Sequence, residues 1–164
     1  MPDLLVIADS GPLIALAGVQ CLDLLPQLYR RVAAPRAVIE EIMAGAHLSP
    51  RHNFLPQISW LEQLEAPVPL DALAIVLGRG EAEAIVLARQ HPGALLLLDD
   101  RQARRAAEAL GLAATGSAGV LVRAKREGLI AAVRPYLMSM RSNGYYMSDR
   151  VIQRACQIAG EIDV

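Results

Sequence analysis

The acidic residues that stand beside strongly apolar stretches carry the chemistry that this sequence suggests. They are Asp9, Glu41 (or its neighbour Glu40), Glu81 and the pair Asp99 and Asp100. Carboxylates that share one site repel each other, and a divalent cation offsets that repulsion. Oxygen ligands without cysteine or clustered histidine suit Mg²⁺ or Mn²⁺ better than Zn²⁺. A cation held in this way can bind a phosphate and orient a hydroxide nucleophile, so the residues point to phosphodiester hydrolysis.

Most of these acids also have an ordinary structural explanation. Asp9 could cap the helix that follows it, and Asp99 or Asp100 could cap the helix expected from Arg101. Glu81 could stabilise a helix N-terminus through the helix dipole. For any one acid, capping is the simpler explanation. Capping does not require several acids to converge, however, so the group as a whole favours a shared site.

Apolar runs and turn signals predict the elements that position the acids. Residues 4–8 predict a buried strand that ends at Asp9, and residues 94–98 predict the strongest strand, which ends at Asp99. Pro35 opens a predicted helix that contains Glu41 and stops at Gly45. The further elements expected are short strands at 32–34, 58–61 and 112–115, and helices at 70–77, 81–90, 101–110, 118–126, 129–141 and 148–160.

The alternation of strands and helices predicts an α/β fold with a mostly parallel central sheet flanked by helices. Fully apolar strands fit a sheet that is covered on both faces. Sites in such sheets lie beyond the carboxyl ends of the strands, where Asp9 and Asp99 stand. The chain of 164 residues is expected to form a single domain, 1–164, with a C-terminal helical extension at about 129–164.

Composition excludes several classes of protein. Hydrophobic residues make up 54% of the chain and the net charge is −1, which excludes intrinsic disorder. The apolar run 94–98, like every other apolar run in the chain, is far shorter than the ~20 residues of a membrane-spanning helix. There is no basic N-terminal region typical of a signal peptide, and Cys21 and Cys156 make no disulfide framework. We therefore expect a soluble cytoplasmic protein without membrane association.

The distribution of charge suggests a phosphate-bearing partner. Residues 1–100 hold six basic and twelve acidic side chains, whereas residues 101–164 hold ten basic and five acidic ones. Arg101, Arg104 and Arg105 share one face of a predicted helix directly after the acidic pair. Arginine suits bidentate phosphate contact. A second basic group consists of Arg123, Lys125 and Arg126. The alternatives to phosphate binding are ion pairing with Glu108 or Glu127, or a solvated helix surface.

Four segments, in order along the chain, resemble the motifs of PIN-domain nucleases. They are VIADSGPLI at 6–14, PRAVIEEI at 35–42, GEAEAIVLA at 80–88 and LLDDRQAR at 97–104. The resemblance covers essentially the whole chain, and it selects Glu41 rather than Glu40 in the second motif. Residues 116–117 and 128–135 are also similar to one branch of the family, which is related to VapC toxins.

The resemblance implies a PIN-like fold and a metal-dependent ribonuclease. The acids implied to bind Mg²⁺ or Mn²⁺ and to carry the catalysis are Asp9, Glu41, Glu81, Asp99 and Asp100, with Ser10 and Ser117 in support. Because the fourth motif has two adjacent aspartates, the sequence does not select between Asp99 and Asp100. Arg101, Arg104 and Arg105 would hold RNA phosphates. The third acid is Glu81 where many VapC toxins have aspartate.

The same resemblance implies partners. The protein would be the toxin of a VapBC-type toxin–antitoxin pair, would bind a cognate antitoxin protein and would form a homodimer. Leu22, Leu25 and Leu28 are candidate dimer contacts, and an equally plain interpretation places them in the core.

Two other classes of protein also have an acidic α/β pocket or this fold. A phosphoacceptor receiver domain needs an acidic pair after its first strand and a lysine after a later strand. Here the acidic pair comes late, and the only lysine, Lys125, lies within a predicted helix. The second class is a catalytically degraded PIN fold that binds RNA or a protein, and it is the alternative to the nuclease. Tyr145 and Tyr146 are predicted to pack at a helix junction.

Overall fold

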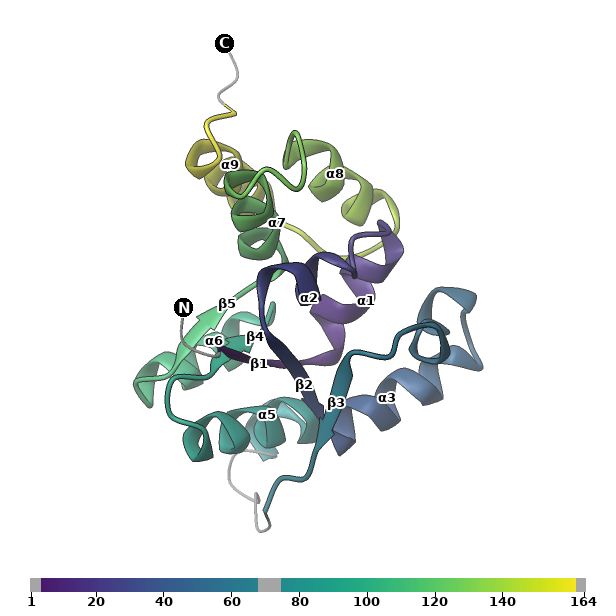
Figure 1. The fold of residues 1–164 in the computed structure, drawn as a ribbon, viewed down its shortest axis with the longest axis vertical. Helices are drawn as coiled ribbons and strands as arrows, with labels where there is room; N and C mark the ends of the chain where they lie inside the picture. Colours follow the sequence, from purple (N-terminus) through teal and green to yellow (C-terminus); the bar gives the residue numbers. More distant parts are fainter. Residues whose placement is uncertain (1–3, 68–74, 162–164) are drawn as a thin grey trace.

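The computed structural model describes residues 4–67 and 75–161, in which helices cover both faces of one parallel sheet (Figure 1). Its strands are β1 (Leu5–Ala8), β2 (Arg31–Pro35), β3 (Leu61–Leu64), β4 (Leu95–Leu97) and β5 (Ala113–Thr115). They are hydrogen-bonded in the order β3-β2-β1-β4-β5, and every pairing is parallel. The α/β fold with a parallel sheet flanked by helices is thus confirmed.

The apolar strands have side chains on both faces because both faces are covered. Val6 and Ala8 of β1 belong to one core cluster, and Leu5 and Ile7 belong to another. The first face is covered by α1 (Ser10–Gly18), α2 (Leu24–Leu28), α7 (Ser117–Arg126) and the helices that pack on them, and the second face by α5 (Arg79–Gln90) and α6 (Arg101–Ala109). This double cover explains why the strands read as continuous apolar runs.

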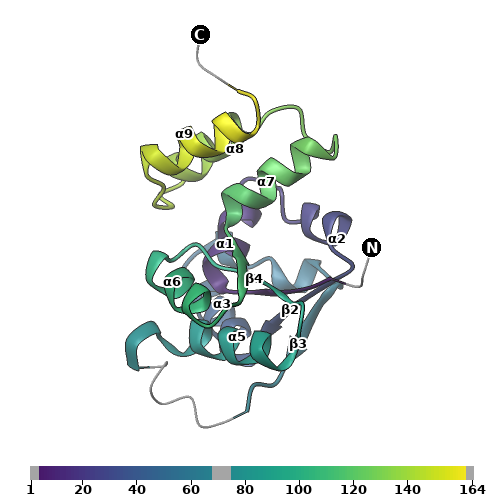
Figure 2. The ribbon, with the colours of Figure 1, turned by 90° about the vertical axis from the view of Figure 1, so that its left-hand side faces the viewer.

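The remaining helices lie at two places in the molecule. α3 (Arg36–Ala46) follows β2 directly and packs against both α1 and α5. α8 (Arg134–Ser142) and α9 (Asp149–Ile158) pack on each other, with α9 against α7 and α8 against α1. Figure 2 shows this helical pair at the end of the molecule away from α5. The short turns η1 (Pro50–His52) and η2 (Leu55–Gln57) join α3 to β3.

Several predicted boundaries differ from the structure. β3 runs over Leu61–Leu64 and not 58–61, because its partner β2 pairs Val32 with Leu61. α5 begins at Arg79, so Gly80 lies inside the helix and Gly78, with φ of 91°, makes the break. The two C-terminal helices are shorter than predicted. The helix predicted at 70–77 lies outside the described residues except for 75–77, which are helical.

The three leucines that were candidate dimer contacts are core residues. Leu22, Leu25 and Leu28 are 7%, 0% and 7% exposed, so their assignment to a surface is wrong and the core interpretation is confirmed. α2, which carries Leu25 and Leu28, packs against the sheet and α7, and Leu22 lies in the turn just before α2. Cys21 and Cys156 are buried free thiols. Among the helices of the described residues, none is long and apolar enough to cross a membrane.

Candidate functional site

The acids meet at the carboxyl edge of the sheet, since all the strands are parallel. Asp9 follows β1 and Asp99 follows β4, and the backbone N–H of Asp9 donates to the Leu97 carbonyl oxygen at 3.0 Å. Glu41 comes from α3 and Glu81 from the first turn of α5. We call the group the acidic site; its members are Asp9, Glu41, Glu81, Asp99 and Asp100.

The pKa values of Asp9 and Glu81 are raised in the acidic site. Burial raises the pKa of Asp9 to about 6; a hydrogen bond from the Ser10 backbone opposes this rise, and the charges of Glu41, Asp99 and Asp100 add to it. Burial also raises the pKa of Glu81 to about 7, with contributions from the charges of Asp9, Asp100 and Glu41. The acids are therefore close enough to disfavour one another's charged forms.

Asp99 and Asp100 have different surroundings, although they are neighbours in the sequence. Asp99 Oδ1 accepts from the Ser117 backbone N–H at 2.7 Å, and Oδ2 accepts from the Ser117 hydroxyl at 2.8 Å and from the Tyr145 hydroxyl. Asp100 Oδ2 accepts from the Ala103 N–H at 2.9 Å and caps α6. The capping alternative therefore holds for Asp100, whereas Asp99 is fixed by Ser117 and Tyr145.

Glu41 is positioned from two sides. The Ser10 hydroxyl donates to Glu41 Oε2 at 2.9 Å, so the Ser10 side chain contacts Glu41 while its backbone contacts Asp9. A Cβ at Gly80 would lie 2.7 Å from Glu41 Oε1 and 3.1 Å from Val38 Cγ2. Glycine at position 80 thus lets α5 approach α3 closely enough to bring Glu81 towards Glu41.

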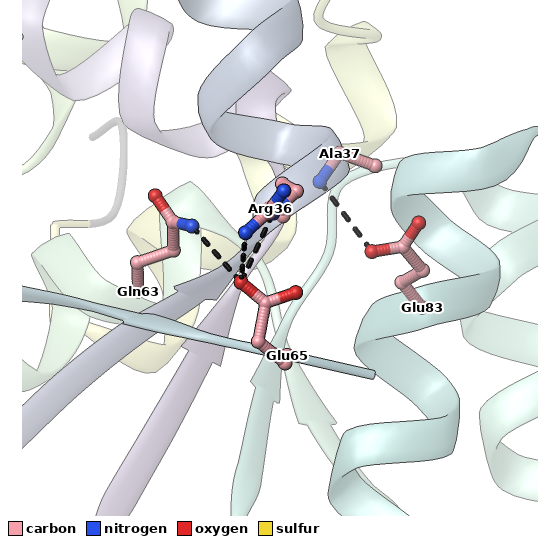
Figure 3. Close-up of polar contacts among 5 residues, drawn as sticks. All are labelled: Arg36, Ala37, Gln63, Glu65 and Glu83. Carbon is pink, nitrogen blue, oxygen red and sulfur yellow. Dashed lines mark hydrogen bonds and ion pairs between the residues drawn. The ribbon is translucent and has the colours of Figure 1, made fainter. Parts of the chain in front are cut away.

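Glu83, two residues after Glu81, has a separate structural role. It is 5% exposed, and its Oε2 accepts from Arg79 Nε at 2.9 Å. Its Oε1 accepts from the backbone N–H of Ala37 at 3.4 Å, at the start of α3 (Figure 3). Glu83 therefore holds α5 against the N-terminus of α3, and the sequence alone does not reveal this role.

A second polar group joins the end of β3 to the start of α3 (Figure 3). Arg36 Nε and Gln63 Nε2 both donate to Glu65 Oε1, at 3.0 and 3.2 Å. The Arg36 and Glu65 side chains are 55% and 62% exposed. Because exposed ion pairs contribute little, this group adds only modestly to the stability of the edge.

The arginines after the acidic pair lie beside the acidic site. Arg101 and Arg105 are exposed on α6, and Arg104 is half-buried with Nη1 close to Gly116. Within residues 4–67 and 75–161 none of the three forms an ion pair, so the pairing with Glu108 is not found. In the second group, Arg123 does pair with Glu127 at 3.2 Å and Lys125 with Glu161 at 3.0 Å.

Tyr145 is a site residue that sequence reasoning missed. It lies between α8 and α9, yet its hydroxyl reaches Asp99. Burial, together with the charges of Asp99, Asp9 and Asp100, holds the pKa of this phenol well above its usual range, so it stays a hydrogen-bond donor. No motif or spacing in the sequence links position 145 to the acids. Tyr146, by contrast, is 87% exposed.

A comparison with protein families matches residues 5–161 to the PIN domain. The chain belongs to the PIN-domain family. The matched region includes α8 and α9, so the C-terminal helices are part of what the chain shares with the family. PIN domains are generally nucleases. A search of curated proteins found no significant match to the chain.

The donor set of this PIN domain suits a hard divalent cation. Its acidic site offers carboxylate oxygens, and the described part of the chain places no neutralising ion pair on Asp9 or Glu81. Burial is the main cause of the raised pKa values of these two acids, and the charges of the neighbouring acids add a repulsion that a cation would relieve. In the described ranges, no three Asp, Glu, His or Cys side chains are already grouped as ligands of one ion. The chemistry of the donors fits such an ion, and the side chains must adjust to hold it.

Proposed function

We propose that this PIN domain is a Mg²⁺- or Mn²⁺-dependent endoribonuclease and the toxin of a VapBC-type pair. The observation that carries the enzymatic part is the convergence of Asp9 and Glu81, whose pKa values rise to about 6 and about 7 at the carboxyl edge. Asp9 is buried and Glu81 is half-buried. Acids that repel each other in such a place lower stability, so their presence at one edge is most simply explained by a bound cation.

Asp9, Glu41 and Glu81 are the acids that would hold the cation, together with Asp99 or Asp100. When bound, the cation supplies positive charge that stabilises phosphate oxygens and favours ionisation of water. Ser10 orients Glu41, and Ser117 orients Asp99. Ligand carboxylates must lose their protons, so cation affinity should rise with pH through the pKa values of Asp9 and Glu81.

An RNA strand would be held through its phosphates by the free face of α6. Arg101 and Arg105 are exposed there, and Arg104 Nη1 and Asp99 Oδ1 both lie close to Gly116. Contacts of this kind position a strand and do not read its sequence. The choice of RNA rather than DNA as the substrate rests on the resemblance of the four motifs to those of PIN-domain nucleases.

The direct test is cleavage of a labelled single-stranded RNA by the purified protein. We expect cleavage with Mg²⁺ or Mn²⁺, none with EDTA, and none after Asp9→Asn or Glu81→Gln. Glu40→Gln is the matched control, because Glu40 lies on the exposed side of α3 and should leave cleavage unchanged. Equal cleavage by wild type and Asp9→Asn would contradict the proposal.

The toxin role, the cognate antitoxin and the homodimer rest on the resemblance alone. Expression of the protein is expected to arrest growth, and co-expression of the product of an adjacent short reading frame should restore growth. Light scattering would measure the mass of the assembly. Growth unaffected by an expressed, cleaving enzyme would contradict the toxin role while leaving the nuclease proposal intact.

The second candidate is a PIN domain that binds RNA or a protein without cleaving. It is favoured by the absence of a ready three-ligand group among the described residues and by the three hydrogen bonds that Asp99 already accepts. RNA binding without cleavage in saturating Mn²⁺, by a folded protein, would support this candidate over the nuclease.

A further inference from the structure

The segment between α8 and α9 reaches the acidic site through one side chain. The Tyr145 hydroxyl donates to Asp99 Oδ2. The segment itself is anchored: the Tyr145 N–H donates to the Met140 carbonyl oxygen at 3.1 Å, and Asn143 Nδ2 donates to the Gly18 carbonyl oxygen at 3.1 Å. The phenol is therefore held from the ends of both α8 and α1.

The hydroxyl also lies against the start of α1. A Cβ at Gly11 would be 3.1 Å from the Tyr145 oxygen, which is closer than most side chains tolerate. Gly11 stands two residues after Asp9. The hydroxyl is thus placed between the segment that carries Asp9 and the residue, Asp99, that follows β4.

The donors around Asp99 restrict its carboxylate to one orientation. Oδ2 accepts from two hydroxyls, those of Ser117 and Tyr145, which use both of its lone pairs. Oδ1 accepts from the Ser117 N–H and keeps one lone pair. Rotation of the carboxylate would break these hydrogen bonds together, in a place where Ser117 is fully buried.

We propose that Tyr145 is a positioning residue of the acidic site. Its hydroxyl holds Asp99 in the one orientation that leaves a lone pair of Oδ1 for a cation. This inference rests on the proposed function, because cation binding is part of that proposal. It also gives α8 and α9 a functional role, since they carry the residue that orients Asp99. Partners that orient a metal ligand typically account for about 10–100-fold in metal affinity.

The test is a titration of the full chain with Mn²⁺ in the absence of RNA, followed by the electron paramagnetic resonance signal of free Mn²⁺. Tyr145→Phe keeps the ring and removes only the hydroxyl, and we expect it to bind Mn²⁺ about tenfold more weakly. Tyr146→Phe is the control, because that ring is 87% exposed. Circular dichroism at the titration temperature checks that both variants are folded. If the hydroxyl had a purely structural role, the Mn²⁺ affinity of the folded Tyr145→Phe protein would be unchanged.

Gly11→Ala tests the same hydroxyl from the opposite side. The added methyl group would push the Tyr145 oxygen away from Asp99 and should weaken Mn²⁺ binding. In the Tyr145→Phe background it should have no further effect, because the next ring atom, Cε2, is 3.9 Å away. Alanine is also the better helix former, so this variant is expected to fold.

Two results would overturn the inference, and they are distinguishable. If wild type binds Mn²⁺ and cleaves RNA while Tyr145→Phe binds Mn²⁺ equally well, the positioning role of Tyr145 is wrong and the proposed function stands. If wild type and all variants alike fail to bind Mn²⁺ and to cleave RNA, the proposed function and the positioning role fall together.

Discussion

Replacement of Asp9 by asparagine should make the metal-free protein more stable at high pH. The side chain keeps its size and an acceptor for the Ser10 N–H, and loses only its charge. Asp9 is 7% exposed, and its pKa rises from 3.8 to about 6, chiefly through burial. The folded state therefore holds this proton more tightly than the unfolded state. The free energy of unfolding of wild type should fall as the pH rises between these two values, and the loss should be complete above the folded-state pKa.

The magnitude follows from the two pKa values. At about 1.36 kcal/mol per tenfold change in proton affinity, a rise from 3.8 to about 6 corresponds to about 3 kcal/mol. Solvent reaches the acidic site beside the exposed Glu41 and screens part of this. We expect Asp9→Asn to exceed wild type by about 1–3 kcal/mol at pH 8, where Asp9 is charged, with little difference at pH 4.

The assay is urea unfolding of both proteins in EDTA at pH 4 and pH 8. Glu40→Gln is the matched control, because it removes the same charge from an exposed position. In buffer without EDTA, free Mn²⁺ at 100 times its dissociation constant should stabilise wild type by about 2.7 kcal/mol, and Asp9→Asn by much less. A difference between Asp9→Asn and wild type that is the same at both pH values would refute the electrostatic reasoning.

Three further predictions concern the surroundings of the acidic site. Gly80→Ala should fold, since alanine favours a helix by up to about 1 kcal/mol, but its methyl group would displace the Glu41 carboxylate and weaken Mn²⁺ binding about tenfold; unchanged binding would contradict the close approach seen here. Glu83→Ala should lower the free energy of unfolding in urea by about 1–3 kcal/mol, and Glu83→Gln by less; equal losses would show that the acceptor oxygen contributes nothing. Arg104→Ala should reduce the slope of log affinity for RNA against log salt by about 0.7, whereas Arg123→Ala, which loses an ion pair on α7, should leave the slope unchanged.

The junctions between strands and acids were predictable from the sequence. Asp9 follows β1 and Asp99 follows β4, as the apolar runs before them predict. Strands buried on both faces are continuous apolar segments, and they end where polar residues begin. For that reason the parallel α/β fold and the edge at which the acids meet could both be inferred before the structure was known.

Other features depended on contacts that local patterns do not encode. Gly80 looks like a helix break, yet it lies inside α5, and glycine is needed there because Glu41 occupies the space that a side chain would fill. A leucine-rich segment such as the one with Leu22, Leu25 and Leu28 could lie either in a core or at an interface. Only the packing of α2, and of the turn before it that carries Leu22, makes them core residues.

What the sequence by itself determined is therefore which residues could do chemistry and the edge of the sheet where they stand. Tertiary structure decided how each one is used. Asp99 and Asp100 are adjacent and chemically identical, and they differ because Ser117, 18 residues away, and Tyr145, 46 residues away, donate to the first, while the second caps its own helix. Local patterns report the burial of a segment, whereas the orientation of a carboxylate depends on donors that only folding brings to it.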